Sequence, residues 1–228
     1  MVQPRPVVVV TGVSSGIGAA VARRLLDEGW AVTGLSRRPP ALADPHLTWV
    51  QVDLLDAAAL DDVLAALPGP TAVVHAAGTL LSGPLGALHP DALALMWGLH
   101  VDAPSRLVDA LADRIPDEGR IVLVGSRTST GVAGKSQYAA TKAAAEALSR
   151  SWAMELAPRR VTVNVVAPGP TRTPMLTSPH RAGTPPVVPP FGRFVEPDEV
   201  AGLVGFLLGP DGRSITGQRL VVCAGASL

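Results

Sequence analysis

Thr11-Gly12-Val13-Ser14-Ser15-Gly16-Ile17-Gly18 is the stretch that decides the fold of this chain. Four consecutive valines at residues 7–10 precede it and predict a strand that is buried on both faces of a parallel sheet. Apolar residues at helical spacing follow over residues 17–26 and predict a helix. A glycine turn between strand and helix lets backbone amides approach a diphosphate; the alternative, a glycine turn that only packs, is disfavoured by the strand before it and the helix after it. The phosphate-binding residues expected here are Gly12, Ser14, Ser15, Gly16, Ile17 and Gly18.

The same alternation of strand and helix continues along the chain. Further strands are expected at residues 31–35, 47–52, 71–75, 121–124, 161–166 and 220–222, and further helices at residues 54–67, 93–111, 138–156 and 200–208. Pro39, Pro40 and Pro45 make a crossover helix between residues 35 and 47 unfavourable, because proline breaks helical hydrogen bonds. This order predicts an α/β fold with a doubly wound parallel sheet of about seven strands and helices on both faces.

Composition limits the class of protein. The chain has 228 residues, of which 47% are hydrophobic and 17% are charged, so we expect one globular domain over residues 1–228 and not a disordered chain. Lys plus Arg number 19 and Asp plus Glu number 19, which leaves no excess positive charge. We therefore expect no nucleic-acid partner.

Cysteine use and hydropathy indicate where the protein works. Cys223 is the only cysteine, so no intrachain disulfide is possible and we expect it to be a buried packing residue. No residue spacing resembles a metal site. The apolar stretch at the N-terminus is too short for a signal peptide or for a membrane span of about 20 residues. These features favour a cytoplasmic protein that binds neither a metal nor a membrane.

Tyr138 and Lys142 are the first residues that point to chemistry. They are four residues apart in a predicted helix, so both lie on one helix face. A phenol has an ordinary pKa of about 10 and supplies phenolate near neutral pH only where a cation stabilises the charged form. Lys142 would be that cation, although a Tyr and a Lys at this spacing often share a helix face for structural reasons alone.

Together these motifs resemble the short-chain dehydrogenase/reductase family, and its ketoreductase-like members in particular, over residues 7–228. The first turn is similar to the family's TGxxxGxG motif, and the Tyr–Lys pair to its catalytic pair. The resemblance implies a Rossmann-type fold and identifies Ser126, twelve residues before Tyr138, as the catalytic serine. Its hydroxyl would hydrogen-bond a substrate carbonyl to which Tyr138 donates a proton. Ser129 and Ser136 are alternatives by composition only.

The resemblance also implies which cofactor is bound. Ser36 occupies the position where NAD-preferring relatives carry an acidic residue, and Arg37 follows it. A guanidinium there can form charge-assisted hydrogen bonds to a 2′-phosphate. We therefore expect NADP(H) to be preferred over NAD(H), the alternative being that Arg37 and Arg38 are only solvated loop charges. Asp53 and Leu54 are expected near the adenine, with a helix N-cap as the alternative role of Asp53.

Two histidines stand where the family usually carries asparagine. His75 precedes Ala77 and Gly78, whose backbone is expected to approach the cofactor, and we interpret His75 as a core histidine with satisfied hydrogen bonds. His100 aligns with the asparagine of the family's proton relay. We expect His100 to hold a relay water near Lys142 or to titrate itself near neutral pH, the alternative being that it only caps a helical kink.

The proline-rich segment after the sixth predicted strand completes the predicted site. Residues 174–195 correspond to the family's substrate lid, and their mostly apolar sequence favours a moderately apolar substrate. The residues that resemble the family's nicotinamide-binding turn are Pro168, Gly169, Thr171 and Thr173. The cationic lid residues, which are able to recognise a carboxylate but are more simply surface charges, are His180, Arg181 and Arg193.

One function fits these residues best. We expect an NADP(H)-dependent oxidoreductase that interconverts a carbonyl and a secondary alcohol by hydride transfer, with Tyr138 as acid or base. The alternative is a non-catalytic dinucleotide-sensing or scaffolding protein of the same fold, and a dehydratase or epimerase is a weaker candidate. The resemblance also implies a homotetramer or homodimer.

Overall fold

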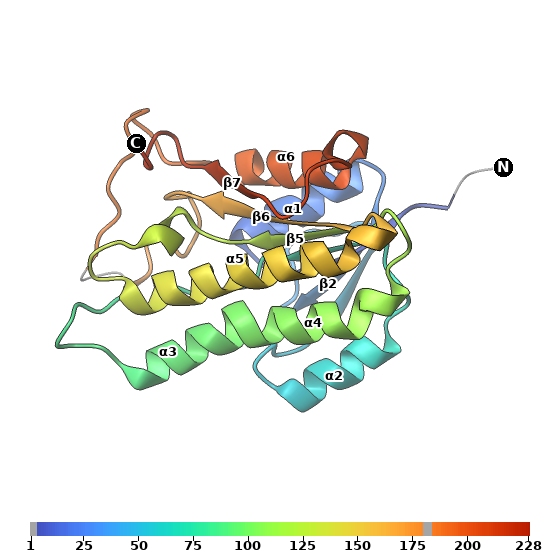
Figure 1. The fold of residues 1–228 in the computed structure, drawn as a ribbon, viewed down its shortest axis with the longest axis horizontal. Helices are drawn as coiled ribbons and strands as arrows, with labels where there is room; N and C mark the ends of the chain where they lie inside the picture. The colour runs from blue at the N-terminus through green and yellow to red at the C-terminus, as the bar shows by residue number, and fades with distance from the viewer. Residues whose placement is uncertain (1–3, 180–183) are drawn as a thin grey trace.

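Seven parallel strands form one sheet with helices on both faces (Figure 1). A computed structural model describes residues 4–179 and 184–228 of the chain. The strand order is β3-β2-β1-β4-β5-β6-β7, and every neighbouring pair is parallel, which confirms the predicted doubly wound sheet. The strands are β1 Val7–Thr11, β2 Ala31–Ser36, β3 Leu47–Gln51, β4 Ala72–His75, β5 Arg120–Val124, β6 Thr162–Pro168 and β7 Arg219–Val222.

The helices lie close to their predicted positions, with small shifts at their ends. The side chain of Asp56 caps α2 by accepting a hydrogen bond from the amide of Ala59 at 3.1 Å, so this helix begins at residue 57 and not at 54. Asp53 is therefore not the N-cap of α2. The helices are α1 Gly16–Asp27, α2 Ala57–Ala66, α3 Pro90–Trp97, α4 Ala103–Leu111, α5 Ser136–Leu156 and α6 Pro197–Leu208.

The single helix predicted over residues 93–111 is wrong in one respect. A π-helical turn, Gly98–Asp102, separates α3 from α4. A π turn widens the helix and disturbs the regular pairing of its carbonyl groups. The carbonyl of Leu99, within this turn, accepts a hydrogen bond from Nε2 of His75 at 2.9 Å. The apolar spacing continues across the turn and predicted one helix, whereas Pro104, which has no amide proton to donate to the preceding turn, was a local signal for an interruption.

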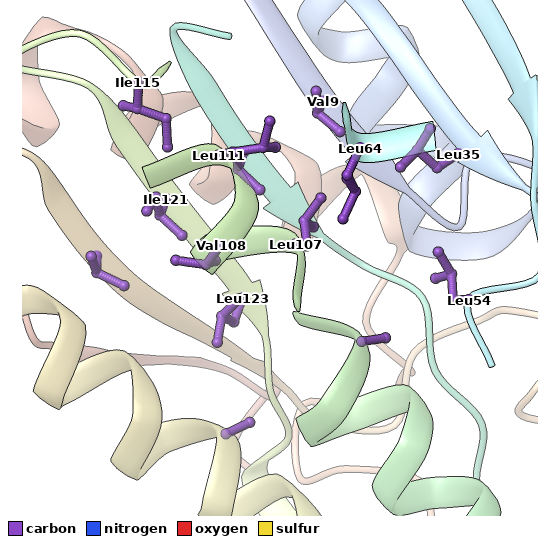
Figure 2. Packing of buried hydrophobic residues seen from close by; sticks show 14 of the residues in the cluster. Val9, Leu35, Leu54, Leu64, Leu107, Val108, Leu111, Ile115, Ile121 and Leu123 are labelled. Carbon is purple, nitrogen blue, oxygen red and sulfur yellow. The ribbon is translucent and has the colours of Figure 1, made fainter. Parts of the chain in front are cut away.

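Alternate residues of the central strands face two different hydrophobic layers. Val9 and Ile121 pack with α2, α4 and α5 (Figure 2), whereas Val8 and Val122 pack with α1 and α6 on the other face. A fully buried leucine such as Leu111 contributes about 1.5–3 kcal/mol to stability. Burial on both faces explains why these strands are continuous apolar runs and do not alternate with polar residues.

The crossover from β2 to β3 contains no helix, as its prolines predicted; residues 37–46 form bends and a turn. The direction in which the chain crosses the sheet reverses at β1, which has β2 on one side and β4 on the other. In doubly wound sheets a ligand crevice forms at this point, at the carboxyl ends of the strands. The loops after β1, β4, β5 and β6 meet there.

Candidate active site

A cleft of about 410 Å³ opens at this edge of the sheet. It contains the predicted catalytic residues and all but one of the predicted cofactor residues, so the fold brings together side chains that are far apart in the sequence. The predicted residues in its wall are Gly12, Ser14, Ser15, Gly16, Ile17, Arg37, Asp53, Leu54, Ala77, Gly78, His100, Ser126, Tyr138, Lys142, Pro168, Gly169, Thr171 and Thr173.

Gly18 is the exception, because it packs beneath the turn and does not line the cleft. A Cβ atom on Gly18 would lie 2.3 Å from the carbonyl oxygen of Gly12, so only glycine lets α1 start this close to the turn. Gly12 itself has φ +77, and a Cβ there would lie 2.9 Å from the amide nitrogen of Ala77. The turn after β1 and the loop after β4 are thus in direct backbone contact.

The start of α1 is suited to an anion. Ser15 is the N-cap residue, its side chain makes no capping hydrogen bond, and the first turn contains no acidic residue. The amides at this helix N-terminus are therefore available to a diphosphate in the cleft. A narrow backbone cradle and uncapped amides are what a dinucleotide requires here, so the residues present fit the expected cofactor.

The far end of the cleft carries two arginines. Ser36 donates a hydrogen bond to the carbonyl of Arg38 at 2.7 Å and accepts one from Nε1 of Trp49 at 3.1 Å, so its hydroxyl is committed to the protein. Arg37 lies at the mouth of the cleft, 4.0 Å from a carboxylate oxygen of Asp53, with 72% of its side chain exposed. This loose ion pair leaves the guanidinium accessible to a phosphate.

Tyr138 and Lys142 project from one face of α5 into the cleft, and both are buried. The Nζ atom of Lys142 donates a hydrogen bond to the carbonyl of Val124 at the end of β5, at 2.8 Å. Burial lowers the pKa of Lys142 from 10.5 to about 8, and the carboxylate of Glu146, one helical turn along, acts in the opposite direction. Lys142 is thus a cation close to its titration point beside a phenol.

Ser126 follows β5 and is held by a local turn. Its hydroxyl is hydrogen-bonded to the hydroxyl of Thr128 and accepts the Thr128 amide at 3.2 Å. Ser129 and Ser136, the alternatives by composition, do not line the cleft. Thr128 is a site residue that the sequence reasoning missed, and its spacing of two residues from Ser126 is the signal for such a turn.

His100, in the π turn, contacts residues around Tyr138. Its Nε2 accepts the amide of Thr79 at 3.2 Å, so in the neutral ring the proton is assigned to Nδ1, which lies 2.9 Å from the hydroxyl of Thr141. That hydroxyl donates to the carbonyl of Tyr138 at 2.9 Å, and the rings of His100 and Tyr138 meet edge to face at 5.5 Å. Burial, followed by the charge of Lys142, lowers the pKa of His100 well below its ordinary value, so the ring is neutral.

His75 agrees with its interpretation as a satisfied core histidine. The hydroxyl of Thr11 accepts the amides of Ala76 and Ala77, both at 3.1 Å, so it donates its own proton to Nδ1 of His75 at 3.0 Å. Nε2 then carries the proton donated to Leu99. Burial, with a smaller effect from the charge of nearby Lys142, lowers the pKa of His75 to about 3. The Leu99 carbonyl in the π turn is thus hydrogen-bonded by His75 and not by His100.

The turn after β6 closes the cleft opposite α5. The amide of Gly169 donates to the carbonyl of Val222 at 2.8 Å, and a Cβ on Gly169 would lie 2.8 Å from half-buried Cys223. The hydroxyl of Thr171 donates back to the carbonyl of Gly169 at 3.0 Å. The side chain of Thr173 lies against the glycine turn after β1, 3.2 Å from where a Cβ on Gly16 would be.

The segment predicted as a lid begins in the cleft wall with Pro174, Met175 and Leu176. Arg193 does not offer a free charge, because its guanidinium is paired with Glu199 through two contacts. His180 and Arg181 lie outside the described residues. Over residues 4–179 and 184–228, no group of three His, Cys, Asp or Glu side chains is placed to hold a metal ion. No helix in those ranges has both the length and the hydropathy to cross a bilayer.

Comparison with known proteins agrees with this geometry. A family model described as Enoyl-(Acyl carrier protein) reductase matches residues 12–227. The chain belongs to the short-chain dehydrogenase/reductase family. This is a family of oxidoreductases, and the seven-stranded parallel sheet is the Rossmann-type fold that the sequence implied.

Relatives of this short-chain dehydrogenase/reductase differ in what they do. It is 33% identical to the 3-oxoacyl-(acyl-carrier-protein) reductase FabG of Vibrio cholerae, over 96% of each chain. It is also 32% identical to the cyclic-di-GMP-binding biofilm dispersal mediator protein of Escherichia coli, over 92% of each chain. Membership of the family therefore does not fix one ligand.

Two solved structures of similar proteins contain a nicotinamide cofactor. One is a blue fluorescent protein from a metagenomic library in complex with NADPH, which is 33% identical with a TM-score of 0.86 over 98% of each chain. The other is a short-chain dehydrogenase from Burkholderia cenocepacia in complex with NADP, which is 32% identical with a TM-score of 0.85 over 97% of each chain.

Proposed function

We propose that this short-chain dehydrogenase/reductase interconverts a carbonyl compound and a secondary alcohol, using NADP(H) in preference to NAD(H). The observation that carries the proposal is the convergence of Ser126, Tyr138 and Lys142 on one wall of the cleft. The cofactor, when bound, would supply or accept the hydride. The residues of the chain then have to bind the carbonyl oxygen and move one proton.

Each of the three residues has a distinct role. The hydroxyl of Ser126 hydrogen-bonds the carbonyl oxygen, where negative charge develops. The phenol of Tyr138 donates its proton to that oxygen during reduction and removes it during oxidation. The buried ammonium of Lys142 stabilises the phenolate that remains, because an opposite charge within a few ångströms favours the ionised form.

For His100 we retain a place in the proton relay. A Cβ atom on Gly78 would lie 2.9 Å from Nε2 of His100 and 3.6 Å from Nζ of Lys142. Both side chains therefore pack against the backbone of Gly78. A neutral ring would act here by holding hydrogen-bonded partners and not by titrating near neutral pH. His100→Ala should alter the pH–rate profile and His100→Asn should restore it, and an unchanged profile in His100→Ala would eliminate the role.

The decisive experiment follows loss of NADPH absorbance with ketones, β-keto esters and aldehydes. Tyr138→Phe keeps the aromatic ring but removes the transferable proton, so turnover should fall by about 10²–10⁴-fold while NADPH still binds. No turnover by the wild-type protein on a broad panel would contradict the proposal.

The cofactor preference is tested in the same assay. If the guanidinium of Arg37 binds a 2′-phosphate, Arg37→Leu should lower the affinity for NADPH by about ten- to a hundredfold and leave the affinity for NADH nearly unchanged. The reason is that charge-assisted hydrogen bonds contribute about 1.5–3 kcal/mol. A wild-type preference for NADH would refute the assignment.

A second candidate is nucleotide binding without turnover, as in a sensor or scaffold. The observation in its favour is the E. coli relative named for binding cyclic-di-GMP. Tight binding of NADPH or cyclic-di-GMP together with no turnover would favour this candidate.

We also retain a homotetramer or homodimer and a cytoplasmic location, and light scattering of the purified protein measures the oligomeric state.

A further inference from the structure

The part of the cleft near Ser126 has an unpaired positive charge. Arg127 directly follows Ser126, is half-buried and lines the cleft. Within the residues that the structure describes, its guanidinium makes no ion pair and no hydrogen bond, whereas Arg193 and Arg219 both pair with carboxylates. A partly buried cation without a protein partner is unfavourable unless something else compensates it.

Among the described residues, no acidic side chain balances Arg127 from across the cleft. Asp53 is the only acidic residue that the described part of the chain contributes to the cleft wall, and it lies beside Arg37 at the opposite end. A second cation, the buried Lys135 immediately before α5, lies in the same wall as Arg127. The proposed cofactor would use Arg37 and Lys142, so the guanidinium of Arg127 remains for the substrate.

The backbone of Arg127 is held by hydrogen bonds, which fixes the point from which its side chain extends. Its carbonyl accepts hydrogen bonds from Nη2 of Arg219 and from the hydroxyl of Thr130, each at 3.3 Å. Arg219 is itself anchored to Glu146 at 2.8 Å. Arg127 and the proposed carbonyl-binding serine line the same cleft, so one small substrate would be able to contact both side chains.

Apolar side chains also line the cleft, among them Leu80, Leu95, Leu99, Met175 and Leu176. We propose that the substrate is a carbonyl compound with an oxyanion, carboxylate or phosphate, near the carbonyl group, and that Arg127 binds this oxyanion. The forked donors of a guanidinium match both kinds of oxyanion. The inference rests on the proposed function and specifies its substrate class.

The test compares each anion with its neutral ester. The substrates are acetoacetate with its methyl ester and acetonylphosphonate with its dimethyl ester, each reduced with NADPH. The pair with the larger ratio of kcat/KM for the anion to kcat/KM for the ester identifies the kind of oxyanion. The wild-type protein should show a kcat/KM at least tenfold higher for one anion than for its ester. Arg127→Met should lower that kcat/KM by about ten- to a hundredfold and change the ester by less than threefold, because only the anion loses a charge-assisted partner.

Two further variants control for folding and for general charge. Arg127→Lys keeps the charge but not the fork and should retain an intermediate preference. Arg213→Met removes an exposed cation away from the cleft and should leave the ratio unchanged. An equal loss of kcat/KM for anion and ester in Arg127→Met would overturn the inference, and so would a wild-type protein that prefers neither anion over its ester.

A binding measurement separates this inference from the proposed function. If the wild-type protein reduces none of the four compounds, hydride transfer to this class is wrong. The Kd of 3-hydroxybutyrate for the NADP-loaded protein then decides about Arg127. Weakening of at least tenfold in Arg127→Met supports the oxyanion site, and unchanged or undetectable binding overturns it.

Discussion

The guanidinium of Arg219 in β7 donates to the carboxylate of Glu146 in α5 at 2.8 Å and reaches the backbone carbonyl of Ser126 at 3.4 Å. One side chain near the end of the chain thus connects the last strand, the helix that carries Tyr138 and Lys142, and the loop that carries the serine. Glu146 also raises the pKa of Lys142. The pair therefore has an electrostatic effect on the site in addition to its structural one.

This relationship predicts opposite pH shifts for two variants. Carbonyl reduction should decline as pH rises through the pKa of Lys142, about 8, because a neutral amine no longer stabilises the phenolate of Tyr138. Glu146→Gln removes a negative charge, lowers the pKa of Lys142 and should move this decline to lower pH. Arg219→Met leaves Glu146 uncompensated and should move it to higher pH. The measurement is kcat/KM against pH from 6 to 10, and shifts of the same sign in both variants would contradict the electrostatic role.

Lys142 should reduce the stability of the fold. Its pKa falls from 10.5 to about 8 on burial, so below pH 8 the folded state retains a charge that it disfavours. Lys142→Met should therefore be more stable than the wild-type protein at pH 7, by up to about 3 kcal/mol, although it loses turnover. Between pH 8 and 10.5 the unfolded chain keeps the proton on Lys142 that the folded chain has lost. The difference in free energy of unfolding between Lys142→Met and the wild-type protein should therefore narrow as pH rises through this range. Urea unfolding at several pH values measures it, and a variant that is less stable at pH 7 would refute the prediction.

His75 should make the fold sensitive to acid. The folded ring titrates at about 3, so between pH 6.5 and 3 the unfolded chain binds a proton that the folded chain does not. Stability should therefore fall with decreasing pH by up to about 1.4 kcal/mol per pH unit from this group. His75→Asn should remove this contribution, whereas His46→Asn, at an exposed position, should leave the slope unchanged. Equal slopes in the wild-type protein and His75→Asn would show that the histidine has no such effect.

Gly12 and Gly86 form a matched pair for the glycine turn. Both have positive φ, +77 and +89, but a Cβ on Gly12 would meet the backbone of Ala77 at 2.9 Å whereas a Cβ on Gly86 would meet nothing within 4 Å. Alanine should cost about 1–2 kcal/mol at either position for the left-handed backbone. Gly12→Ala should cost more in thermal unfolding and should weaken NADPH at least tenfold in a fluorescence titration. Comparable effects of the two variants on NADPH would argue against the backbone cradle.

The sequence was sufficient for the order of strands and helices, because buried strands, prolines and the glycine turn are local signals. It was also sufficient for the four-residue spacing of Tyr138 and Lys142, which becomes a shared helix face in any α-helix. The division of residues 93–111 was missed because the apolar spacing continues across it, although Pro104 is a local signal for an interruption. The hydrogen bond from His75 to the carbonyl of Leu99 in that turn was not predictable, because the two residues are 24 apart and meet only after the sheet forms.

The roles of the polar side chains were decided by the tertiary structure. The sequence places Glu199 six residues after Arg193, its partner, but does not show that the guanidinium of Arg127 has no carboxylate partner among the described residues. Pairing depends on which carboxylates the fold brings within a few ångströms, and Glu146 reaches Arg219 across 73 residues. Local periodicity therefore indicated the fold of this chain, and short motifs indicated its family by resemblance. Charge, burial and protonation in the cleft were set by contacts between distant segments, because electrostatic energies depend on distance in space and on exclusion of water.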